Sequence, residues 1–99
     1  MFFEHHRALQ RRLLAETFPL LTVAAHRLLR ARPTPGLTVQ RVIEYGVLRA
    51  AGLADIVSRT QVNLFRRAPR AQLRAMVLKG AIKAMALFVS IEHLRGRRR

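Results

Sequence analysis

The sequence predicts an all-α fold: a small helical hairpin or bundle, or a set of extended helices, with a long apolar helix near the C-terminal end. Three observations lead to this class. Apolar residues recur at spacings of three and four along most of the 99 residues, no segment keeps the apolar–polar alternation of a β-strand, and Pro or Gly residues stand between the helical segments. A chain of this length is expected to form a single domain.

The N-terminal segment, residues 1–31, is predicted to be a kinked helix or a helical hairpin. Residues 2–18 show the helical period. Pro19 lacks the backbone N–H that a helix interior uses, so we expect it to end or kink this helix. The helical pattern resumes over residues 20–31. One side of the first stretch would carry Phe2, His6, Leu9, Leu13 and Thr17.

A linker over residues 32–37 contains the strongest helix-breaking run in the chain, Arg-Pro-Thr-Pro-Gly. Thr38 follows it and is suited to cap a helix, because its hydroxyl can accept a bond from a free backbone N–H. The apolar spacing then predicts helices over residues 39–51 and 53–67, with Gly52 as the stop between them.

The last predicted helix, residues 69–95, completes a helical body over residues 38–95 and leaves a basic tail at 96–99. Pro69 suits the start of a helix, since its missing N–H has no partner there in any case. Between Ala75 and Ile91 almost every residue outside one narrow stripe is apolar. A helix that is apolar most of the way round is buried in protein or in lipid.

Three settings are open for this helix: the core of a small bundle, the surface of larger subunits, or an oblique position at a membrane interface. An autonomous membrane span is disfavoured. A span needs about 20 largely apolar residues, whereas the longest charge-free run of this helix is Ala84 to Ile91, and Lys79 and Lys83 precede it.

Small residues spaced four apart predict close packing between helices. Gly46 with Ala50, and Gly80 with Ala84, have this spacing. Such pairs allow two backbones to approach closely, although the chain is rich in alanine throughout.

The charge balance indicates the class of partner. The chain carries 19 Lys and Arg against 5 Asp and Glu, a formal charge of +14, yet 51% of it is hydrophobic. Self-repulsion at this charge opposes an isolated compact state, and polyanions such as RNA, DNA or anionic lipid are the natural partners. A freestanding soluble enzyme is not expected. The absence of Cys excludes disulfides and cysteine-based zinc sites.

Basic clusters near the expected helix ends are the candidate contacts with lipid headgroups or RNA phosphates. Arg dominates, with 17 Arg against 2 Lys, and its planar guanidinium binds phosphate through two donors; a GC-rich genome would produce the same excess. The predicted contact residues are Arg66, Arg67, Arg70, Arg74, Lys79, Lys83, Arg95, Arg97, Arg98 and Arg99.

No catalytic, cofactor or metal site is predicted. His5 and His6 are adjacent and would point about 100° apart on a helix, so they do not converge on one ion. Asp55 and Ser58 share a helix side, but Ser58 is expected to have no nearby histidine. A helix-turn-helix over residues 47–67, with its turn at Gly52, lacks the usual spacing of small residues.

These features favour a non-catalytic accessory subunit of a large membrane-associated mitochondrial complex, either of the respiratory chain or ATP synthase. We expect it at the inner membrane or its matrix face, packed on other protein subunits and anchored by arginines to cardiolipin-like anionic lipid or acidic subunits. The amphipathic, Arg-containing N-terminal helix is typical of organellar targeting segments. Such segments are poor in acidic residues, so Glu4 and Glu16 count against this interpretation. The alternative is a basic protein of an organellar ribosome that binds rRNA phosphates, and DNA-binding or regulatory roles are further options.

Overall fold

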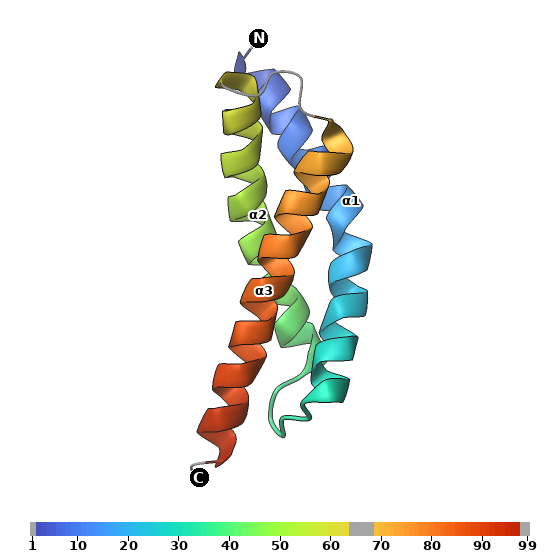
Figure 1. Cartoon of the computed structure of the whole chain (residues 1–99), viewed down its shortest axis with the longest axis vertical. Helices are drawn as coiled ribbons and strands as arrows, with labels where there is room; N and C mark the ends of the chain where they lie inside the picture. The colour runs from blue at the N-terminus through green and yellow to red at the C-terminus, as the bar shows by residue number, and fades with distance from the viewer. Residues whose placement is uncertain (1, 64–68, 98–99) are drawn as a thin grey trace.

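The computed structural model describes the backbone of residues 2–63 and 69–97, and the side chains of residues 4–59 and 69–97. Within these ranges the chain forms three helices and no strand: α1 (Phe2–Ala31), α2 (Val39–Asn63) and α3 (Arg70–Arg97). The predicted all-α class is therefore confirmed. The helices run up and down beside one another in a bundle that measures 52 × 21 × 18 Å (Figure 1).

Helix α1 continues through Pro19, so the proline does not end it. The buried side chains Leu13, Thr17, Leu21 and Ala25 follow at four-residue spacing on both sides of the proline, whose own ring is exposed. Because packing against the bundle fixes both halves of the helix, the local breaking signal is overridden. Pro19 still has no N–H to donate to the Ala15 carbonyl, so α1 lacks one helical hydrogen bond at this point.

The predicted linker forms a tight connection between α1 and α2. Leu37 N–H donates to the Thr34 carbonyl at 3.1 Å, and Gly36 between them has a φ of +86°, which a residue with a Cβ rarely adopts. Thr38 caps α2 as predicted: its hydroxyl accepts from the Arg41 N–H at 3.2 Å.

Helix α2 does not stop at Gly52, and this part of the sequence prediction is wrong. The two predicted helices are one, which reaches Asn63, and its buried positions Ala50, Ala54 and Val57 continue across the glycine. A glycine ends a helix only where the chain turns into the left-handed region, and Gly52 does not do so. The continuous helix also removes the turn that a helix-turn-helix would need.

Helix α3 begins at Arg70, and the Pro69 carbonyl just before it accepts from the backbone N–H groups of Gln72 and Leu73. The helix ends at Arg97, two residues beyond the predicted end at residue 95. The long C-terminal helix is therefore present. Within the described residues, no helix has both the length and the continuous apolar character that a membrane crossing requires.

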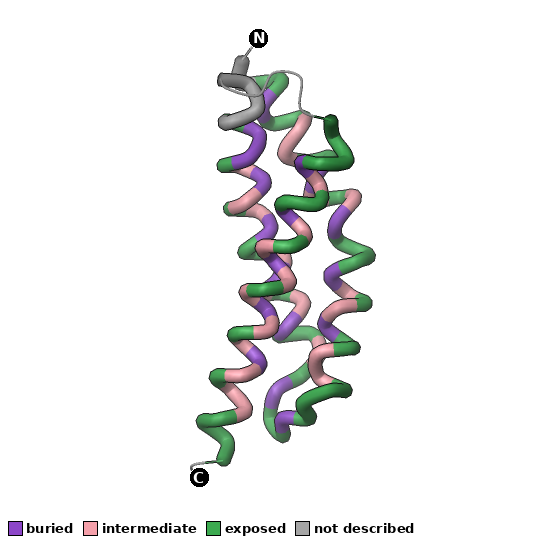
Figure 2. Tube along the Cα trace, in the orientation of Figure 1, coloured by how far each residue is buried: buried purple, intermediate pink, exposed green. Residues whose placement is uncertain are grey.

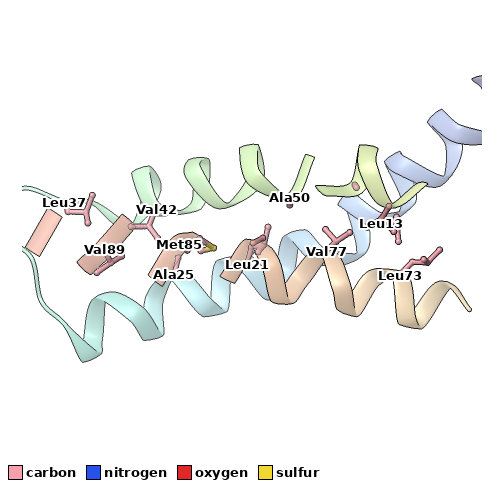
Figure 3. Close-up of a cluster of buried hydrophobic side chains, with 13 residues drawn as sticks. Leu13, Leu21, Ala25, Leu37, Val42, Ala50, Leu73, Val77, Met85 and Val89 are labelled. Atoms are coloured by element: carbon pink, nitrogen blue, oxygen red, sulfur yellow. The ribbon is translucent and has the colours of Figure 1, made fainter. Parts of the chain in front are cut away.

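The core is a narrow apolar seam along the bundle axis, with buried positions facing inward on all three helices (Figure 2). Helix α3 contributes one residue per turn, and Figure 3 shows several of these side chains meeting those of α1 and α2. Leu37 from the linker closes one end of the seam. The residues from α3 are Leu73, Val77, Ala81, Met85 and Val89.

Glycines bring α2 and α3 close together, as the small-residue spacing predicted. A Cβ at Gly46 would overlap Met85, with the side-chain Cγ only 2.9 Å away, and a Cβ at Gly80 would lie 2.7 Å from Leu53 Cδ1. A methyl group at Gly46 would force buried Met85 to move, whereas one at Gly80 would meet only the flexible end of Leu53, so Gly46 limits the approach of the helices more strictly.

Candidate functional site

The predicted cationic residues are not gathered at one place. Arg70 and Arg74 lie at the start of α3, whereas Arg95 and Arg97 lie at its end, about 40 Å away at 1.5 Å per residue. Arg66, Arg67, Arg98 and Arg99 lie outside the described residues.

Two of the predicted contact residues bind the chain itself. Arg70 Nε lies 3.3 Å from Glu16 Oε1, and Arg74 Nη1 lies 3.9 Å from Glu16 Oε2. These contacts tie the start of α3 to α1. Because both arginines are half-exposed, the pairs are worth little as stability, but they leave less charge for a polyanion at this end.

Lys79 and Lys83 lie on the outward side of α3 and are exposed. Neither is within ion-pairing distance of a described carboxylate. Arg95 lies 3.4 Å from Glu92 of its own helix, while Arg97 is exposed at the last turn. Among the described side chains, Lys79, Lys83 and Arg97 are therefore the predicted contacts that are exposed and have no carboxylate partner.

Cations exceed their carboxylate partners over the whole described surface. Four of the 19 Lys and Arg residues lie outside the described side chains; of the other 15, only Arg59, Arg70, Arg74 and Arg95 form ion pairs with Asp or Glu. Eleven described cations thus face solvent or polar groups without a carboxylate partner. A field of this sign attracts polyanions and acidic surfaces.

The linker end of the bundle contains a cationic residue that sequence reasoning missed. Arg41, in the first turn of α2, lines a hollow of about 290 Å³ together with Thr34, Arg95 and Glu92. Arg32 lies at the same end and donates to Ser90 Oγ at 3.0 Å. From the sequence, Arg41 could be placed only in the first turn of a helix, three residues after the Thr38 cap. Its position beside Glu92 and Arg95 could not be predicted, because it depends on how α2 packs against the end of α3.

A buried polar network joins α1 to α2. His6 Nε2 lies 2.8 Å from Asp55 Oδ1, and His6 Nδ1 lies 2.7 Å from Ser58 Oγ. The Ser58 hydroxyl also lies 3.0 Å from the Asp55 carbonyl. The prediction that Ser58 has no histidine nearby is wrong: His6 and Ser58 are 52 residues apart in the chain, but the fold brings their side chains into contact.

The three residues do not form a catalytic triad. Ser58 is fully buried, and a nucleophile must reach its substrate. Its hydroxyl instead serves as a donor or acceptor between His6 and the helix backbone, so every member of the network has a partner. The arrangement fixes α1 against α2.

The carboxyl group of Asp55 is held in its ionised form by this network. The hydrogen bond with His6 lowers its pKa below the ordinary value of 3.8, partial burial opposes that shift, and Arg59, at 3.2 Å, lowers it further. The native state therefore binds a proton at Asp55 less readily than the unfolded chain does.

This shift predicts a loss of stability in acid. Above the ordinary pKa of 3.8 the ionised Asp55 contributes its full stabilisation, and the contribution disappears as the pH falls through 3.8 towards the lower native pKa. Urea unfolding of the native protein and of Asp55→Asn should differ most near neutral pH, and the difference should shrink in acid. A difference that grows as the pH falls would contradict the assignment.

Large apolar side chains are exposed beside these charges. Met76, Leu87, Ile91 and Leu94 of α3 are 53–58% exposed although the helix buries a full stripe in the core. The side of α3 that faces away from the core therefore exposes both large apolar side chains and the two lysines.

An open groove of about 520 Å³ runs between α2 and α3. Leu48, Gly52 and Ile56 line it on α2, and Leu87 is among the residues that line it on α3. We call it the α2–α3 groove. Sequence reasoning did not find it, because Leu48, Ile56 and Leu87 count among the apolar positions of their helices, and no local pattern shows that they border one groove.

No group of three or more His, Cys, Asp or Glu side chains among the described residues is placed to hold a metal ion. Comparison with family models, with curated proteins and with solved structures finds no match to the chain.

Proposed function

We propose that the chain is a non-catalytic structural subunit of a larger membrane-associated assembly, in which its apolar surface packs on other subunits and its cations meet anionic lipid headgroups. The observation that carries this proposal is the outward side of α3, where Lys79 and Lys83 stand among half-exposed Met76, Leu87 and Ile91. A lysine keeps its stem on apolar surface while its ammonium group reaches phosphates.

The same surface argues for lipid over RNA. Phosphate contacts explain binding of a basic protein to RNA, but they give no reason for large apolar side chains to be exposed beside the lysines. A lipid interface takes both, since the apolar side chains enter the boundary of the acyl chains while the cations stay among headgroups. The proposed setting is a mitochondrial respiratory or ATP-synthase complex at the inner membrane, on the sequence grounds given above.

Binding to vesicles tests this proposal. The protein is expected to float with vesicles of phosphatidylcholine and cardiolipin, and not with phosphatidylcholine alone. Each Lys near an anionic membrane contributes about 1 kcal/mol, so Lys79→Glu with Lys83→Glu should weaken binding at least tenfold. Arg7→Glu with Arg11→Glu, which changes the net charge equally on α1, should weaken it much less.

The apolar part of the contact has its own readout. Ile91→Ser with Leu94→Ser, both at exposed positions, should remove the binding that persists at high salt, because salt screens the headgroup attraction and not the apolar contact. If structured RNA binds more tightly than the vesicles and displaces the protein from them, the ribosomal alternative replaces this proposal.

A further inference from the structure

The shape of the α2–α3 groove fits a helix. Its sides are the exposed Leu48 and Ile56, 70% and 60% accessible, and Leu87 across from them. Its small residues are Gly52 on α2 and Ala84 on α3, while Gly80, which also lines it, already has Leu53 packed against it. A row of small residues between larger apolar ones lets another helix approach closely and seat its own apolar side chains between them.

The groove is long and open, which distinguishes it from a site for a small molecule. Small-molecule sites enclose most of their ligand, whereas here Gly52 faces open space: a Cβ built there meets nothing within 4 Å. The volume above Gly52 is thus free for side chains that come from outside the bundle.

The charges along the groove are positive. Arg49 lines it, and the guanidinium is held 5.2 Å from the Tyr45 ring centre while Arg49 Nε donates to the Tyr45 hydroxyl at 3.1 Å. Lys83 lies beside it on α3, three residues after Gly80 and four before Leu87, which are neighbouring positions on a helix surface. No residue lining the groove is acidic.

This charge selects among occupants. A second copy of the chain would bring another +14 to the contact, so like-charge repulsion opposes self-association. A partner helix with acidic residues beside its apolar stripe would meet Arg49 and Lys83 with opposite charge. Complementary charges at the rim of an interface raise the association rate and exclude wrong partners.

We propose that the α2–α3 groove binds an amphipathic helix of a partner protein whose apolar stripe is flanked by acidic side chains. The inference deepens the proposed function, because it names the surface and the chemistry through which a neighbouring subunit would dock. Lys83 and Leu87 border both this groove and the proposed lipid surface, so the two contacts are separated with Gly52, which belongs to the groove alone.

The test uses the whole chain and two synthetic helical peptides with the same leucine stripe, one flanked by Glu and the other by Lys. The Glu peptide is expected to bind with saturation in fluorescence anisotropy, and the Lys peptide is not. Gly52→Phe fills the groove from a position with free space around it, so the variant should stay folded and should weaken binding at least tenfold.

Charge reversal supplies the matched control. Arg49→Glu with Lys83→Glu should weaken binding of the Glu peptide and permit binding of the Lys peptide, whereas Arg27→Glu with Arg30→Glu, equal in net charge change on α1, should do neither. Equal effects of the two double variants would show attraction to total charge only, and the proposal would fail. It would also fail if Gly52→Phe bound normally, or if the protein alone dimerised through this groove. Vesicle binding by Gly52→Phe should be unchanged, which separates this result from the lipid proposal.

Discussion

Replacing Gly46 with Ala is expected to lower the free energy of unfolding by about 1–3 kcal/mol, since an added methyl group overpacks the contact with Met85. Met85 is fully buried, and its Cγ would lie 2.9 Å from the new Cβ. Cγ follows directly after Cβ, so either Met85 changes its rotamer within a filled core or the two helices move apart, and both cost stability. Urea unfolding followed by far-UV circular dichroism at fixed ionic strength measures the change.

Gly52→Ala is the matched control, because the same methyl group is added to the same helix. A Cβ at Gly52 has nothing within 4 Å, so only the gain in helix propensity remains, and the free energy of unfolding should rise by about 0.5–1 kcal/mol. Gly80→Ala should fall between the two, since the atom it meets is the flexible end of Leu53. If Gly46→Ala were as stable as Gly52→Ala, the close approach of α2 and α3 at Met85 would be wrong.

The sequence was informative about the helices wherever a local signal acts without competition. The run Arg-Pro-Thr-Pro-Gly must leave the helix, and Thr38 can cap whatever follows it, so the linker and the start of α2 were predictable. Gly52 and Pro19 carry breaking signals of similar kind, but buried residues on both sides of each hold the helix together. Local propensity is a weak prior, and tertiary packing overrides it.

The candidate site was less predictable, because exposure and pairing depend on which helices meet. In the sequence nothing pairs Arg70 or Arg74 with a carboxylate, but the fold places Glu16 of α1 beside both. Lys79 and Lys83, whose spacing puts them on one side of the helix, are exposed to solvent in the structure. The groove needs Gly52 and Leu87 from separate helices, which no local pattern joins.

His6→Ala is expected to lower the free energy of unfolding by about 2–4 kcal/mol, although the residue lies near one end of the bundle. The imidazole is buried, and its loss removes the contacts with Ser58 and Asp55 that bind α1 to α2. A lost hydrogen bond to a charged group costs about 1.5–3 kcal/mol, and the emptied ring volume adds to it. Ser58 keeps its bond to the Asp55 carbonyl and Asp55 keeps Arg59, so neither partner is left unsatisfied.

His5→Ala provides the comparison, because it removes an exposed imidazole from the adjacent position and should change the free energy of unfolding by no more than about 0.5 kcal/mol. A double-mutant cycle with Ser58→Ala then separates the network from simple loss of volume. Side chains in contact are expected to couple by about 0.5–3 kcal/mol, so the loss in the double variant should differ from the sum of the single losses by that much. Strict additivity would mean that His6 and Ser58 do not interact in solution, and the network would then not be what holds α1 on α2.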